Sequence, residues 1–172
     1  MEKDPILEFI ERLPFFKEFS DQEKVKLLGT PGIFEKYENG KNIIKEGEIG
    51  AALFVVLTGS IRITKSIVAP VKEGHISLQK PREIGIVELK AGSIFGEVSM
   101  LSYRPRNTNA YANSQQVVVM KFTQEIIEKF NLSIQKKFQD QLILTLVHRL
   151  DDINKQYIQL KSSIEQGNTT RM

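Results

Sequence analysis

The sequence predicts a mainly β domain with helices on both sides, and three observations lead to this fold class. Two capped helical patterns precede Pro31. Short β-rich runs punctuated by glycine follow, and the chain closes with a long apolar stripe at helical spacing. Many short strands with regular turn signals indicate a sandwich, a barrel or a jelly roll. The expected strands cover residues 32–37, 42–45, 53–57, 60–65, 84–89 and 116–122.

Composition limits the classes of protein. A chain of 172 residues with 41% hydrophobic residues suits one compact domain with a helical appendage. The net charge of +3 is too mild to argue for nucleic acid, and the absence of cysteine excludes disulfides, thiolate metal sites and a thiol nucleophile. The acidic start is unlike a signal peptide, and the longest wholly apolar run, 51–57, is far shorter than the roughly 20 residues of a membrane helix. We therefore expect a cytoplasmic protein without a membrane span.

The N-terminal helices carry clear start signals. Asp4 can cap a first helix in which Pro5 takes the first position, and Pro14 ends it. Ser20 and Glu23 have the spacing of a capping box, in which each side chain accepts a hydrogen bond from the other residue's backbone N–H. Gly29 can then end the second helix.

The β region contains one long connection, residues 66–83, which includes two prolines and a glycine. We interpret it as a long hairpin connection in which residues 76–78 are briefly extended. The glycines that bound the other strands supply positive φ angles or room for close approach.

The C-terminal part is predicted to be helical. Thr123 can cap a short helix through Phe130, and Ser133 can cap a long one. From Leu146 the apolar steps are 4, 3, 4, 3, 4, which is heptad-like, so the stripe packs as a lid on the β core or seals a dimer. The polar tail after Gln166 is expected to fray. The apolar positions are Phe138, Leu142, Leu146, Leu150, Ile153, Tyr157, Leu160 and Ile164.

The segment that carries chemistry runs over residues 92–101 and continues through 105–110. Gly96 allows a backbone to come close to a ligand, and Glu97 can begin a short helix whose free N–H groups attract an anion. Arg106 offers a planar fork of donors that suits two phosphate oxygens. A carboxylate and a guanidinium on one loop suit a ligand with both hydroxyls and a phosphate, such as a ribose phosphate.

At these residues the chain resembles the cyclic-nucleotide-binding domain family. The family's phosphate-binding cassette reads approximately Phe-Gly-Glu, a few mostly apolar residues and then Pro-Arg, and here it is 95–97 followed by 105–106. The resemblance extends to motifs at 13–16, 43–48, 53–63 and 117–122, and it covers roughly residues 10–160.

The resemblance implies an eight-stranded jelly-roll-like β barrel with N-terminal helices and C-terminal hinge and lid helices. The chain would then divide into four parts. These are a helical lead at 1–31, a binding core at 32–122, hinge and lid or dimerisation helices at 123–166, and a flexible tail at 167–172.

The resemblance also implies residue roles. Glu97 would accept a hydrogen bond from the ribose 2′-hydroxyl, Arg106 would pair with the cyclic phosphate, and Ile63 would contact the base. The residue after the arginine helps to select the base in this family, and Asn107 is neither small and apolar nor a hydroxyl residue. The implied ligand-binding set is Phe95, Gly96, Glu97, Val98, Ser99, Arg106, Asn107 and Ile63, and the candidates to cap the base are Arg149, Leu150 and Tyr157.

Simpler interpretations stand beside these roles. An isolated Glu97 would be a surface or capping acid, and Arg106 could be a structural partner of Glu97 or Asp140. The two histidines, His75 and His148, have no second histidine nearby and predict no metal site. No catalytic arrangement is visible, so we expect no enzyme and in particular no phosphodiesterase.

The resulting expectation is a sensor that binds a cyclic purine mononucleotide, cAMP ahead of cGMP, without a further cofactor, and that moves its C-terminal helices in response. The alternative is a scaffold or interaction domain with a silent or altered pocket. Only about twenty residues follow Leu150, so we expect no DNA-binding domain and a stand-alone sensor. Its output would be an unidentified protein partner or a homodimer through residues 138–164.

Overall fold

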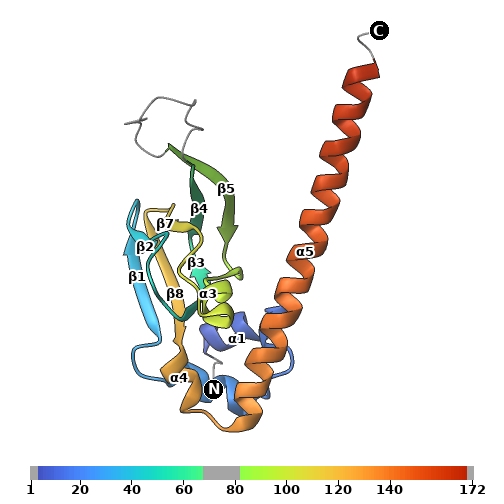
Figure 1. Cartoon of the computed structure of the whole chain (residues 1–172). Coiled ribbons are helices and arrows are strands. Elements are labelled where there is room, and N and C mark those ends of the chain that lie inside the picture. Colours follow the sequence, from blue (N-terminus) through green and yellow to red (C-terminus); the bar gives the residue numbers. More distant parts are fainter. Residues whose placement is uncertain (1–3, 68–81, 170–172) are drawn as a thin grey trace.

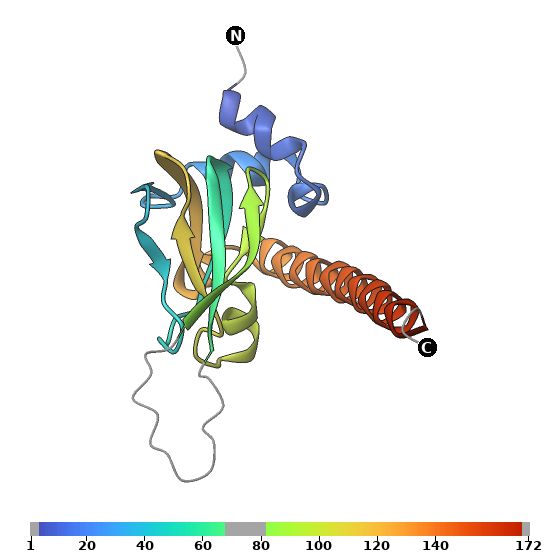
Figure 2. The same ribbon diagram turned by 90° about the horizontal axis from the view of Figure 1, so that it is seen from above.

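A computed structural model describes residues 4–67 and 82–169, with side chains described as far as Glu165. Two antiparallel sheets form the body of the domain, the N-terminal helices lie at one end of it, and one long helix leaves it (Figures 1 and 2). The prediction of a mainly β fold flanked by helices is confirmed.

The eight strands of the described chain form two sheets of four. One sheet has the order β1 (Phe34–Glu38), β8 (Gln116–Thr123), β3 (Ala52–Thr58), β6 (Ile94–Phe95). The other has the order β2 (Asn42–Ile44), β7 (Asn109–Ala112), β4 (Ser60–Ile67), β5 (Arg82–Lys90). The prediction of a closed barrel is wrong for the described chain. Among the described residues, no strand pairing joins the two sheets. Each sheet ends in edge strands instead, and one of these, β6, has only two residues.

The six expected strands correspond to β1–β5 and β8, with ends displaced by at most two residues. The tight turn between β3 and β4 requires Gly59, since its φ is +79° and a Cβ there would lie 2.7 Å from the Gln116 carbonyl oxygen. Strands β6 and β7 were not predicted, because runs of two and four residues carry too little periodicity. The predicted extension at 76–78 and most of the 66–83 connection lie outside the described residues.

The predicted caps of the first helices are confirmed. Asp4 caps α1 (Pro5–Glu11), and Ser20 and Glu23 form the capping box of α2 (Asp21–Leu28), which ends at Gly29. Between them Pro14 begins a 3-10 turn, η1 (Pro14–Phe16).

The later helices are α3 (Glu97–Ser102), α4 (Gln124–Glu128) and α5 (Leu132–Thr169). Thr123 caps α4 as predicted. The predicted Ser133 cap is wrong, because α5 begins at Leu132 and the cap is Asn131, two residues earlier, whose Oδ1 accepts from the Ile134 backbone N–H at 3.0 Å. Helix α5 extends three residues past Gln166 into the expected tail, and 170–172 lie outside the described residues.

Two buried clusters hold the elements together. One lies between the two sheets and includes Phe54, Ile61 and Phe95. The other joins the N-terminal helices, the sheet of β3 and β8, and the base of α5, and its centre is aromatic. Its rings, in edge-to-face, stacked and tilted contacts, are Phe15, Phe16, Phe19, Phe122 and Phe138.

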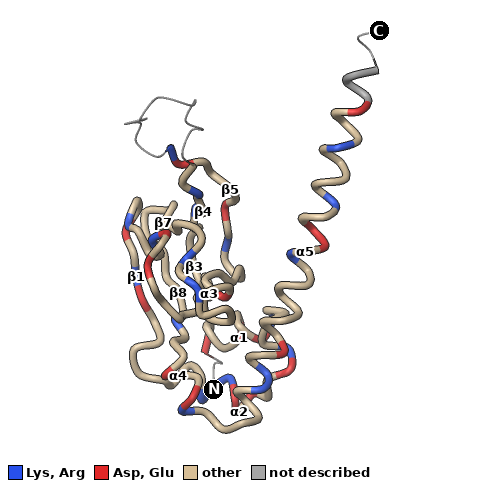
Figure 3. Tube along the Cα trace, viewed as in Figure 1, with Lys and Arg blue, Asp and Glu red and all other residues tan. Residues whose placement is uncertain are grey.

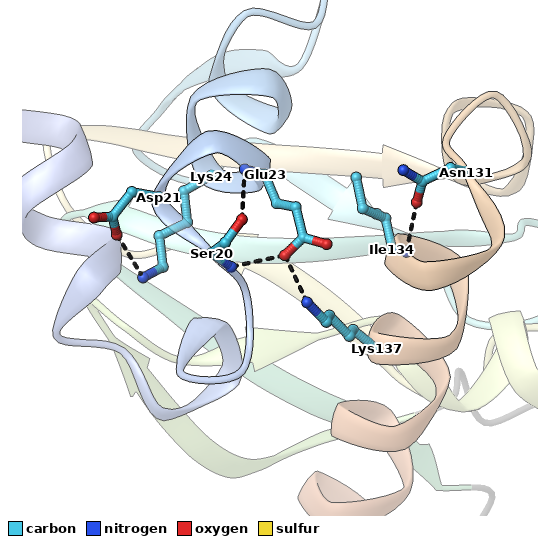
Figure 4. A network of polar contacts seen from close by, with 7 residues as sticks. All are labelled: Ser20, Asp21, Glu23, Lys24, Asn131, Ile134 and Lys137. Atoms are coloured by element: carbon cyan, nitrogen blue, oxygen red, sulfur yellow. Dashed lines mark hydrogen bonds and ion pairs between the residues drawn. The ribbon is translucent and has the colours of Figure 1, made fainter.

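A polar contact reinforces the base of α5. Lys137 Nζ donates to Glu23 Oε2 at 2.6 Å, so the acid of the α2 capping box also holds α5 (Figure 4). The hydrogen bond from Lys137 is the main cause that lowers the pKa of Glu23.

Beyond its base, α5 projects away from the sheets (Figures 1 and 2). Every residue from 150 to 165 is exposed, and charges of both signs are interspersed along the helix (Figure 3). Neither α5 nor any other described helix has the continuous apolar stretch that a membrane crossing requires.

Candidate functional site

The candidate site is built where β6 turns into α3. Gly96 makes this turn with a φ of +81°, and a Cβ on it would lie 2.6 Å from the Ala52 carbonyl oxygen. Only glycine suits this backbone without strain. Glu97 follows as the first residue of α3 and is 1% exposed.

Arg106 brings the second charged group to the same place. It is 8% exposed, and its Nη1 donates to the Gly96 carbonyl and to the Ser99 hydroxyl, both at 2.6 Å. Its Nη2 donates to the Ala52 carbonyl at 3.0 Å. Burial lowers the pKa of Arg106, and the nearby Glu97 carboxylate opposes this shift. The guanidinium is therefore fixed against the turn that carries Glu97.

The loop between β2 and β3 holds Arg106 from the other side, which the sequence analysis missed. The Arg106 backbone N–H donates to the Glu48 carbonyl and its carbonyl accepts from the Gly47 N–H, both at 2.8 Å. A Cβ on Gly50 would lie 3.2 Å from Arg106 Nε, so the guanidinium lies against this glycine. The only sequence signal for this role was the pair of glycines in the loop.

The long helix reaches the cassette through one residue. The Arg149 guanidinium donates to Glu97 Oε1 and to the Ile94 carbonyl. Glu97 thus forms its ion pair with Arg149. Among the described residues, the side-chain hydrogen bonds of Arg106 go to Gly96, Ser99 and Ala52, and the alternative in which Arg106 pairs with Glu97 or Asp140 is not what these contacts show. Leu150 and Tyr157, the other two candidates to cap the base, are exposed where α5 leaves the domain.

The remaining predicted residues lie around this centre. Phe95 stacks on Phe54 with ring centroids 4.9 Å apart and belongs to the core between the sheets. Ile63 is buried on β4 opposite Ala110, and Val98 is partly exposed on α3.

Asn107 is exposed and is tied to the β4 strand through its backbone. Its carbonyl accepts from Lys65 Nζ at 2.6 Å, and the same ammonium pairs with Glu46 at 2.5 Å. The hydrogen bond from Lys65 is the main cause that lowers the pKa of Glu46. The contact with Lys65 is made by the backbone carbonyl of Asn107 and does not involve its side chain.

A hollow of about 570 Å³ lies beside Arg106, between the 43–52 loop and the start of α4. Charged groups of both signs line it, including Lys45, Glu48 and Lys121. Glu97 and Ile63 do not line it. Over residues 4–67 and 82–169, no group of three or more His, Cys, Asp or Glu residues could hold a metal ion.

A comparison with known protein families identifies the family of this chain. The cyclic nucleotide-binding domain family matches residues 34–131, which include the whole β body, the cassette and α4. The chain belongs to this family.

Similar proteins include a protein kinase and a regulatory subunit of a protein kinase. The chain is 27% identical to a cGMP-dependent protein kinase, egl-4, of Caenorhabditis elegans over 90% of this chain and 20% of that protein. It is 25% identical to a cAMP-dependent protein kinase type II regulatory subunit of Drosophila melanogaster over 61% of this chain and 24% of that protein. The chain thus spans about a fifth to a quarter of the length of these relatives.

Among solved structures, a cyclic nucleotide-binding domain from Methylobacillus flagellatus has the same fold, with a TM-score of 0.68. It is 23% identical, and the alignment covers 89% of this chain and 80% of that one.

Proposed function

We propose that this chain binds a cyclic purine mononucleotide and acts as a signalling sensor. The observation that carries the proposal is the presence of two buried groups of opposite charge on one cassette, Glu97 and Arg106. A carboxylate accepts a hydrogen bond from a ribose hydroxyl, and a guanidinium presents a fork of donors to two phosphate oxygens. The backbone N–H groups of Gly96, Val98 and Ser99 complete the phosphate and sugar contacts.

Base recognition is proposed from neighbouring elements. Ile63 on β4 contacts the base from the sheet side. Leu150 and Tyr157 would reach the base only after α5 changes its direction, because both are exposed where the helix projects outward. Ligand binding can drive such a change only through different affinities for the two arrangements.

The preferred nucleotide is proposed to be cAMP. In the family that the cassette resembles, a hydroxyl residue after the arginine can favour guanine, and here that residue is Asn107. Similar proteins with cAMP or cGMP in their names do not separate the two, so the preference rests on this one position.

The output is proposed to pass through α5. Its exposed heptad stripe suits a second copy of this chain, and the kinase-related names of similar proteins suggest a protein partner as the other route. The cassette holds a phosphate without attacking it, so we propose binding without turnover.

Calorimetric titration of the purified chain with cAMP and then cGMP tests the proposal. We expect one site per chain and a lower dissociation constant for cAMP, with no hydrolysis of either nucleotide when divalent metal is added. Circular dichroism and removal of carried-over nucleotide serve as controls.

A scaffold with a silent pocket is the second candidate, because Glu97 and Arg106 are both engaged by groups of the protein itself. No heat with either nucleotide, from folded and nucleotide-free protein, would favour this candidate.

A further inference from the structure

Helix α5 is attached to the domain by two different kinds of contact. Near its base, Ile134, Phe138 and Leu142 are buried in the aromatic cluster. Further along the same side, the contact is the polar pair between Arg149 and Glu97. Every residue from 150 to 165 is exposed, and of the contacts described above between α5 and the rest of the domain, the Arg149 pair lies furthest along the helix.

The two partners of this pair differ in freedom. Glu97 is 1% exposed and fixed in the first turn of α3, whereas the Arg149 side chain is 38% exposed. A ligand hydroxyl can reach a carboxylate that is 1% exposed only if a covering group moves. Of the two side chains, Arg149 is the one with room to withdraw, because it is the more exposed and is followed by the exposed part of α5.

Exchange of Arg149 for a ribose hydroxyl has an unfavourable component. The hydroxyl is a neutral donor, so Glu97 exchanges an ion pair, in which both partners are charged, for a hydrogen bond in which only the acceptor is charged. The nucleotide must offset this loss through its phosphate and base contacts, and its apparent affinity falls accordingly.

We propose that Arg149 is a latch that competes with the nucleotide ribose for Glu97, so that ligand binding releases α5 from about residue 143 outward while its base stays anchored. This inference rests on the proposed function. The position of the helix would then be controlled by one ion pair, whose two residues lie 52 positions apart in sequence. In the latched state Arg149 would oppose ligand binding.

The test compares nucleotide affinities of the full chain and of Arg149→Gln by calorimetry. We expect Arg149→Gln to bind cAMP about tenfold more tightly, within the usual range of coupling between sites. The gain should be much smaller for 2′-deoxy-cAMP, which lacks the hydroxyl that competes for Glu97. Lys161→Gln is the matched control, since it removes an exposed cation from the same helix and should change neither affinity.

Helix release is measured separately with two spin labels. The chain has no cysteine, so Lys36→Cys on β1 and Ser162→Cys on α5 give two exposed, specific sites. We expect cAMP to shift the distance between the labels, and Arg149→Gln to show a similar shift without nucleotide. An unchanged distance at saturating cAMP would overturn the release of α5.

The outcomes separate the two proposals. Binding of cAMP that is unchanged or weakened by Arg149→Gln overturns the latch and leaves the sensor function standing. Absence of binding to both proteins overturns the sensor function and with it the competition. Binding by the variant alone supports both.

Discussion

The Arg106 guanidinium and the Ser99 hydroxyl lie 2.6 Å apart, which joins the cation of the cassette to the helix that Glu97 begins. Through this contact and those to Gly96 and Ala52, one side chain fixes the relative positions of α3 and β3. The group that we propose to bind the phosphate thus also has a structural role, and its removal should affect both properties.

Arg106→Ala is expected to weaken cAMP binding by more than about 100-fold, because the cyclic phosphate loses its charged partner. It should also lower the free energy of unfolding by about 1–3 kcal/mol, since buried carbonyls lose their donor. Calorimetry and thermal unfolding measure the two effects. Arg106→Lys, which keeps the charge but not the fork, should restore part of the binding, and unchanged affinity in Arg106→Ala would place the phosphate site elsewhere.

Glu97→Gln is best examined in the Arg149→Gln background, where the latch is already absent. We expect the added change to weaken cAMP about tenfold and 2′-deoxy-cAMP far less, because a charged acceptor of the 2′-hydroxyl becomes a neutral one. The ratio of the two affinities is the measurement. Equal losses for both nucleotides would contradict the ribose role.

Gly50→Val should reduce cAMP affinity by about tenfold, because a side chain at this position displaces the Arg106 guanidinium from the 45–52 loop. Gly85→Ala on β5 is the matched control, since a Cβ there meets no atom within 4 Å. Calorimetric titration of both variants with cAMP measures the two affinities. If Gly50→Val binds like the unmodified chain, the loop does not position Arg106 for the ligand.

Lys137→Gln should lower the free energy of unfolding by about 0.5–1 kcal/mol at neutral pH. The folded-state pKa of Glu23 is lowered, chiefly by its bond to Lys137, so this stabilisation is present above the unfolded pKa and is lost as pH falls through the folded one. Urea unfolding over a pH series should therefore show the deficit shrinking in acid. Lys136→Gln is exposed and should show no deficit; a deficit independent of pH would exclude the ion pair as its cause.

The exposed stripe of α5 should form a homodimer. We expect about twice the chain mass in light scattering at tens of micromolar, and the monomer mass for the double variant Ile153→Lys with Leu160→Lys, because two charges then face the apolar seam. Ser162→Lys, away from the seam, should remain dimeric. A monomeric mass for the unmodified chain would exclude this interface.

Much of the fold could be predicted because its signals are local. The capping box of Ser20 and Glu23 and the cap at Thr123 each depend on residues three apart in sequence. The six strands that were predicted correspond to β-rich runs between turn glycines. The cap of α5 was placed two residues too late, because Asn131 and Ser133 are both competent caps and the folded chain uses Asn131.

The sequence by itself determined the cassette: Gly96, Glu97 and Arg106 could be recognised by type and spacing. The tertiary structure decided what surrounds them. It joined Arg149 to Glu97, placed the loop of Gly47 and Gly50 around Arg106, and kept the sheets as two layers instead of a closed barrel. The physical reason is that these contacts depend on the direction of α5 and the pairing of strand edges, which arise from the packing of the whole domain and leave no periodic signal in the chain.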